Sequence, residues 1–127
     1  MENTNFKFRD WTIYKDARAF RKEINELLKA YPKEEKFALV DQTKRALDSI
    51  LLNIAEGAAK NSDKDTRVYI NRSQGSLNEV VSCLDCAMDD SYITKQKYEE
   101  LLRTADTLAR QLNRFNLYLK NSSVVKD

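Results

Sequence analysis

Apolar residues recur every three or four positions along four segments of the chain, and polar residues fill the positions between them. This spacing places the apolar side chains of each segment on one face of an α-helix. The pattern therefore predicts four helices, over residues 11–30, 34–59, 63–90 and 95–119. In the second helix the predicted core face consists of Thr43, Leu47, Ile50 and Ile54.

Residues at the segment ends support these boundaries. We expect Asp10 to cap the first helix, and Pro32 should end it because a proline pushes the preceding residue out of the α region. Ser62 with Asp65 resembles a capping box for the third helix, and Thr94 suits the N-cap of the fourth. The connections between the predicted helices are therefore short.

Four amphipathic helices with short connections are typical of an all-α, up-down-up-down antiparallel four-helix bundle. The chain has 127 residues, which fits a single domain over residues 1–127. It contains only two glycines and one proline, so it lacks the frequent turn residues of a β fold. We expect residues 1–10 to be extended and residues 121–127 to fray.

The second and third helices each carry a further stripe beside the predicted core face. Gly75 lies in the middle of the third helix, where glycine costs about 1 kcal/mol relative to alanine, so we expect another backbone to pass close to it. We interpret both stripes as second packing faces; the alternative is an ordinary solvated helix surface. The stripes consist of Gln42, Arg45, Ser49, Asn53 and Glu56, and of Val68, Arg72, Gly75, Glu79, Cys83 and Cys86.

The charge balance adds a weak indication of an anionic partner. The chain has 22 basic and 20 acidic residues, a formal net charge of +2. The first and last predicted helices are the positive ones, and as neighbours in a bundle they could join their outer faces into one patch for a phosphate backbone. The alternative is that exposed helix faces are simply rich in Lys and Arg. The candidate contacts are Lys15, Arg18, Lys22, Lys29, Arg103, Arg110 and Arg114.

No catalytic, cofactor or metal site is predicted. The chain has no histidine, the commonest general base and metal ligand. Cys83 and Cys86 have the spacing of a redox pair, but they lie late in a long helix, and zinc would need two further ligands. No segment resembles a membrane span or a signal peptide, so we expect a cytoplasmic protein with reduced thiols.

Two sequence motifs carry a family resemblance. The chain resembles the four-helix-bundle proteins called 23S rRNA intervening-sequence proteins, whose biochemical role is not established. The first motif reads Leu39-x-x-Gln42-x-x-Arg45-Ala46-x-x-Ser49-Ile50-x-x-Asn53-Ile54-Ala55-Glu56-Gly57, and the second reads Gly75-Ser76-Leu77-x-Glu79. Relatives include the accessory protein of diversity-generating retroelements, a homopentamer that binds nucleic acid and a reverse transcriptase.

The resemblance implies a bacterial, cytoplasmic, non-enzymatic bundle that forms a ring oligomer, with a pentamer preferred. It also implies RNA or DNA, and a reverse transcriptase or another protein, as candidate partners. We expect Arg45 and Glu79 to form charge-assisted hydrogen bonds within or between subunits. Nucleic-acid binding should be electrostatic and not sequence-specific, since no aromatic platform accompanies the basic residues. The alternative function is a protein-protein interaction scaffold with no nucleic-acid role.

Overall fold

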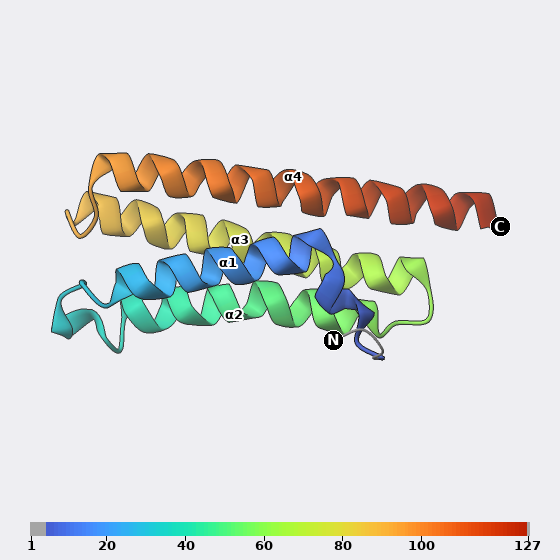
Figure 1. The fold of residues 1–127 in the computed structure, drawn as a ribbon, viewed down its shortest axis with the longest axis horizontal. Coiled ribbons are helices and arrows are strands. Elements are labelled where there is room, and N and C mark those ends of the chain that lie inside the picture. The colour runs from blue at the N-terminus through green and yellow to red at the C-terminus, as the bar shows by residue number, and fades with distance from the viewer. Residues whose placement is uncertain (1–4, 127) are drawn as a thin grey trace.

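Four long antiparallel helices form the protein, as the hydrophobic pattern predicts. The computed structural model describes residues 5–126. Helices α1 (Thr12–Leu28), α2 (Leu39–Ala58), α3 (Asp63–Asp89) and α4 (Lys95–Lys126) run alternately in opposite directions (Figure 1). Each helix packs against the next in the chain, and α1 closes the bundle against α4. The prediction of an all-α, up-down-up-down four-helix bundle is confirmed.

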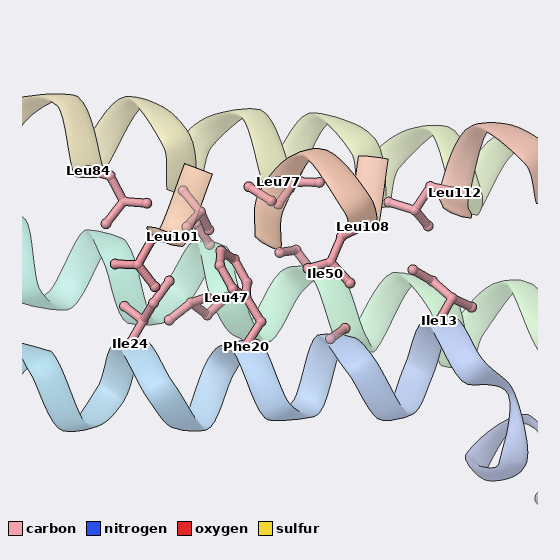
Figure 2. Close-up of a cluster of buried hydrophobic side chains, with 14 of the residues drawn as sticks. Ile13, Phe20, Ile24, Leu47, Ile50, Leu77, Leu84, Leu101, Leu108 and Leu112 are labelled. Carbon is pink, nitrogen blue, oxygen red and sulfur yellow. The ribbon is translucent and has the colours of Figure 1, made fainter. Parts of the chain in front are cut away.

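The core lies along the bundle axis and receives side chains from all four helices. Phe20 of α1, Leu47 of α2, Leu84 of α3 and Leu108 of α4 are almost fully buried and point into the same interior (Figure 2). Burial of one such side chain contributes about 1.5–3 kcal/mol to the stability of the fold. All four residues expected on the core face of the second helix are buried: Thr43, Leu47, Ile50 and Ile54.

The N-terminal segment is not extended as expected. Residues Lys7–Asp10 form a short 3₁₀-helix, and Trp11 rather than Asp10 is the N-cap of α1, with no side-chain capping bond. The indole of Trp11 packs edge-on against the ring of Phe115 in α4, with ring centroids 5.1 Å apart. Trp11 therefore packs against α4 and does not belong to the apolar core face of α1.

The connection between α1 and α2 also differs from the prediction. The second helix begins at Leu39 instead of residue 34, and the 3₁₀ turn Lys33–Glu35 precedes it. Ala38 has φ −122° and ψ −102°, outside the helical region, so the α-helix cannot extend back through it. The carboxylate of Glu35 accepts a hydrogen bond from the Leu39 backbone N–H at 3.3 Å, which supplies a partner for this exposed helix end.

The predicted caps of α3 and α4 are present. Ser62 Oγ accepts a hydrogen bond from the Asp65 backbone N–H at 3.2 Å, and Thr94 Oγ1 accepts one from Lys97 at 3.1 Å. Helix α4 continues to Lys126 instead of ending at residue 119, because no glycine or proline interrupts it. The expectation of a frayed tail is therefore wrong for residues 121–126. Asp127 lies outside the described residues.

Candidate nucleic-acid interface

A row of basic side chains follows the outer surface of α1. Lys15, Arg18 and Lys22 are exposed and line a groove of about 330 Å³ whose opposite wall includes Leu51 of α2. None of the three forms an ion pair in the part of the chain that the structure describes. Arg21, in the same groove, is instead paired with Asp48 of α2, with Nε and Oδ1 2.6 Å apart.

A second group of basic residues extends this row toward the connection between α1 and α2. The lysines Lys29, Lys33, Lys36 and Lys44 line a second groove of about 320 Å³, beside Tyr31. Only Lys29 was expected from the sequence. Lys33 and Lys36 belong to the 3₁₀ turn and the residue that follows it, and Lys44 belongs to α2. Because these lysines do not lie on one helix, helical periodicity could not group them. The high density of lysine around Pro32 was the sequence feature that could have indicated this group.

The carboxylates on this side of the molecule are largely neutralised by pairing. Besides Asp48, Glu26 pairs with Lys29 at 3.0 Å, and Asp41 pairs with Arg45 at 3.0 Å. Lys29 is therefore paired, whereas Lys33, Lys36 and Lys44 form no ion pair with another described residue. We call this surface the basic side, and define it by Lys15, Arg18, Lys22, Lys29, Lys33, Lys36 and Lys44.

The basic residues expected on the last helix lie on its outer surface. Arg103, Arg110 and Arg114 are all exposed, and Arg110 pairs with Asp106 of its own helix at 3.0 Å. Arg103 and Arg114 form no ion pair with any other described residue. These arginines thus form a row of their own on α4.

Acidic side chains separate the α4 row from the basic side along the α1–α4 seam. Asp16 of α1 accepts a hydrogen bond from Gln111 Nε2 at 2.8 Å, and Glu23 pairs with Lys97 at 2.8 Å. The hydrogen bond that Lys97 Nζ donates to Glu23 Oε2 raises the pKa of Lys97 and favours its charged ammonium. The two basic rows therefore do not merge along this seam, and the structure extends the α1 row toward α2 instead.

The two further stripes of α2 and α3 meet in one surface. Ser49 Oγ of α2 and Ser76 Oγ of α3 share a hydrogen bond of 2.7 Å, and Asn53 Nδ2 donates to Ser49 Oγ at 3.0 Å. Gln42 and Glu56 at the edges are exposed. One side-chain hydrogen bond thus joins the two helices at Ser49 and Ser76. Most other residues of the two stripes are exposed in the single subunit, so the second packing face stays a prediction.

The close backbone approach occurs at Gly57 rather than at Gly75. A Cβ added at Gly57 would lie 3.1 Å from Tyr69 Cβ and 3.3 Å from the Thr66 carbonyl oxygen, both in α3. A Cβ added at Gly75 would meet nothing within 4 Å. The expectation of a tight contact at Gly75 is therefore wrong within one subunit, since the residue faces open space.

The charge-assisted bonds expected at Arg45 and Glu79 are only partly present. Arg45 Nε lies 3.0 Å from Asp41 Oδ2, one turn earlier in α2. Glu79 is exposed and has no ion pair among the described residues. Arg45 and Glu79 are thus not paired with each other within the subunit.

Only one of the two thiols has the environment of a packing residue. Cys83 is buried and Cys86 is exposed. Burial raises the pKa of the Cys83 thiol, which disfavours the nucleophilic thiolate. No cluster of three potential metal ligands exists among the described residues. The same part of the chain holds no helix with the length and apolar character needed to cross a bilayer.

Comparisons with known proteins agree with this architecture. The 23S rRNA-intervening sequence protein family matches residues 9–114. The crystal structure of a protein with unknown function from the S23 ribosomal protein family of Bacteroides thetaiotaomicron VPI-5482 is similar, with a TM-score of 0.76 and 25% sequence identity. The similarity covers 85% of this chain and 97% of that chain. No curated protein matches the sequence. Because the family match spans most of the chain and the fold agrees, the chain belongs to the 23S rRNA-intervening sequence protein family.

Proposed function

We propose that this protein is a non-enzymatic nucleic-acid-binding protein that contacts phosphate groups through its basic side. The observation that carries the proposal is the pair of adjacent grooves between α1 and α2, which are lined by the basic side with few competing carboxylates. Lys15, Arg18 and Lys22 form no ion pair within the described part of the chain and can bind phosphate oxygens. Each phosphate contact releases counterions, which drives association at low salt.

Binding through the basic side should not depend on sequence. Its residues are lysines and one arginine spread along a smooth helical surface, and contacts to phosphates position a protein without identifying bases. No recognisable groove-reading motif accompanies these residues. Affinity should therefore depend mainly on the length and charge density of the nucleic acid.

We further propose self-assembly, preferably into a pentameric ring, in which a surface that we call the α2–α3 face is one of the two different contact surfaces of each subunit. This face consists of Ser49, Leu52, Asn53, Val68 and Gly75. Leu52 and Val68 are apolar yet 65% and 44% exposed, and the open space at Gly75 leaves room for another chain to approach. A ring would repeat the basic side in every subunit and increase avidity for a nucleic acid that spans several copies.

Charge reversal on α1 tests the nucleic-acid role. We expect Lys15→Glu, Arg18→Glu and Lys22→Glu together to weaken binding of a labelled RNA by about tenfold or more at low salt, because three phosphate contacts are lost. The slope of log affinity against log salt should decrease by about three, one unit for each contact. Fluorescence anisotropy at several salt concentrations measures both quantities.

The matched control changes the same amount of charge elsewhere. Lys64, Lys95 and Lys120 are exposed and lie outside the basic side, so their replacement by Glu changes the net charge equally. If this control weakens binding as much as the α1 variant, the effect comes from net charge and the basic side has no special role. If the wild-type protein binds neither RNA nor DNA at low salt, the alternative of a protein-interaction scaffold is favoured, with Leu52 and Val68 as its exposed apolar contacts.

A further inference from the structure

A third groove lies between the first turn of α1 and the C-terminal half of α4, away from the basic side. Its volume is about 430 Å³. It is lined by Trp11, Thr12, Ile13, Gln111, Arg114 and Phe115. Phosphate binding by the basic side does not involve this groove, although Arg114 is one of the basic residues expected to bind nucleic acid.

Two aromatic rings provide an apolar wall of the groove. Trp11 and Phe115 are only partly buried, and their ring planes meet at 89°. A perpendicular pair of this kind leaves part of each ring surface unstacked, and every nucleobase has a flat face that stacks on such a surface. The groove therefore offers the aromatic platform that no segment of the sequence shows by itself.

Arg114 gives the groove a positive edge. Its guanidinium is exposed and makes no ion pair with another described residue. A guanidinium beside an aromatic wall suits a ligand that has both a flat ring and a phosphate, because it can bind phosphate oxygens through two parallel N–H bonds. Charge complementarity thus favours a nucleotide over an uncharged apolar ligand.

Gln111 ties the floor of the groove to α1. Its Nε2 donates to Asp16 Oδ2 at 2.8 Å, which fixes the amide. Its Oε1 is buried and has no hydrogen-bond partner within the structure described, so a ligand in the groove does not reach this oxygen.

We propose that this groove binds one nucleobase of a single-stranded nucleic acid, stacked on the free face of one of its two aromatic rings and edge-on to the other. Arg114 binds the adjacent phosphate. This inference rests on the proposed nucleic-acid role and adds a single-strand contact to it. Because every base has a flat face, the contact should tolerate different bases.

Trp11 is the only tryptophan of the chain, so its fluorescence reports on the groove directly. We expect a short oligocytidylate and a short oligouridylate each to quench this fluorescence, because both offer flat bases for stacking. Inorganic polyphosphate of similar charge, which has no bases, should leave the fluorescence almost unchanged. Equal quenching by polyphosphate, or none by the oligocytidylate, would overturn the proposal.

Two variants test the contributions of the ring and the charge. Phe115→Leu keeps an apolar side chain but removes a stacking surface, and should weaken the oligocytidylate quench by about tenfold. Tyr118→Leu is the matched control, because Tyr118 is an aromatic residue of the same helix, 67% exposed and outside the groove. Arg114→Gln, at an exposed position, should weaken quenching by the oligonucleotide but not by the nucleoside cytidine. Quenching that is the same in all three variants contradicts base binding in this groove.

The two proposals fail in distinguishable ways. If labelled RNA binds with salt dependence through the basic side while Trp11 is not quenched, the groove proposal is wrong and the phosphate-binding role of the basic side stands. If cytidine quenches Trp11 but the α1 charge reversal leaves RNA binding unchanged, the groove is a base site and the basic side is not the phosphate surface.

Discussion

At the scale of single residues, the two glycines of the chain have opposite surroundings although both lie in helices. Gly57 lets α2 approach α3 so closely that Thr66 Oγ1 donates to the Gly57 carbonyl oxygen at 2.9 Å. At Gly75, by contrast, no neighbouring helix comes within 4 Å of the place that a Cβ would occupy. Packing of α2 against α3 therefore requires a glycine at Gly57. At Gly75 glycine lowers the stability of the helix, and no contact within the single subunit explains why glycine is there.

Alanine substitution should separate these two roles. Gly75→Ala should raise the free energy of unfolding by about 1 kcal/mol through helix propensity. Gly57→Ala should be less stabilising than Gly75→Ala by about 1 kcal/mol or more, because its new Cβ lies against Tyr69 Cβ and a backbone oxygen, which offsets the same gain in helix propensity. Urea unfolding at low protein concentration, where assembly contributes least, measures both changes. A Gly57→Ala variant as stable as Gly75→Ala would show that α2 and α3 can separate at no cost.

At the scale of elements, one end of the bundle is closed by contacts between its two connections. The Tyr92 hydroxyl, just after α3, donates to Glu35 Oε2 at 2.6 Å, and the rings of Tyr31 and Tyr92 lie 5.3 Å apart. Burial, and then the nearby Cys83, raise the pKa of Tyr31 to about 12. The hydrogen bond to Glu35, and then burial, raise the pKa of Tyr92 to about 12.

These pKa values predict a specific loss of stability in alkali. Both phenols ionise near pH 10 in the unfolded chain but near 12 in the fold, so their contribution is fully present below pH 10 and is lost as the pH rises toward 12. We expect Tyr31→Phe and Tyr92→Phe each to reduce the fall in melting temperature between pH 9.5 and 11, roughly the range where the unfolded phenol titrates. If the melting temperature falls by the same amount in the wild type and in both variants, the tyrosines do not have this role.

At the scale of the whole molecule, the basic side and the α2–α3 face occupy different parts of the bundle surface. The basic side follows α1 and its grooves toward α2, whereas Gly75 and Val68 lie on α3. Self-assembly through the α2–α3 face would therefore leave the basic side accessible. A closed ring needs two different contact surfaces per subunit, while a two-fold dimer needs one that pairs with itself.

Light scattering at micromolar concentration tests the assembly. We expect a mass above that of the 14.8 kDa chain, with the pentamer preferred over the dimer. Gly75→Leu should lower this mass without lowering the melting temperature of the subunit, because no neighbouring helix of the same chain contacts the position. Glu99→Leu, at an exposed position of α4, is the control. A monomeric wild type, or a Gly75→Leu variant of unchanged mass, would exclude this mode of assembly.

The sequence by itself determined the helices and the core, because both follow from local periodicity. Positions such as Leu47 and Ile50 recur at helical spacing and must be buried together, and Ser62 and Thr94 cap helices through bonds to residues three positions away. The start of α2 was misjudged because Glu35, which accepts a hydrogen bond from the Leu39 backbone N–H, is also held by Tyr92, which is distant in sequence. The family motif was likewise readable from one segment at a time.

Only the tertiary structure decided which surfaces these helices share. The sequence named Lys15, Arg18 and Lys22 but could not show that α1 turns Asp16 and Glu23 toward α4, because that depends on the rotation of α1 within the bundle. It could not assign the close approach to Gly57 rather than Gly75, since the distance between helices is set by packing. The groove at Trp11 combines residues from the two ends of the chain, and only the closure of α1 against α4 brings them together.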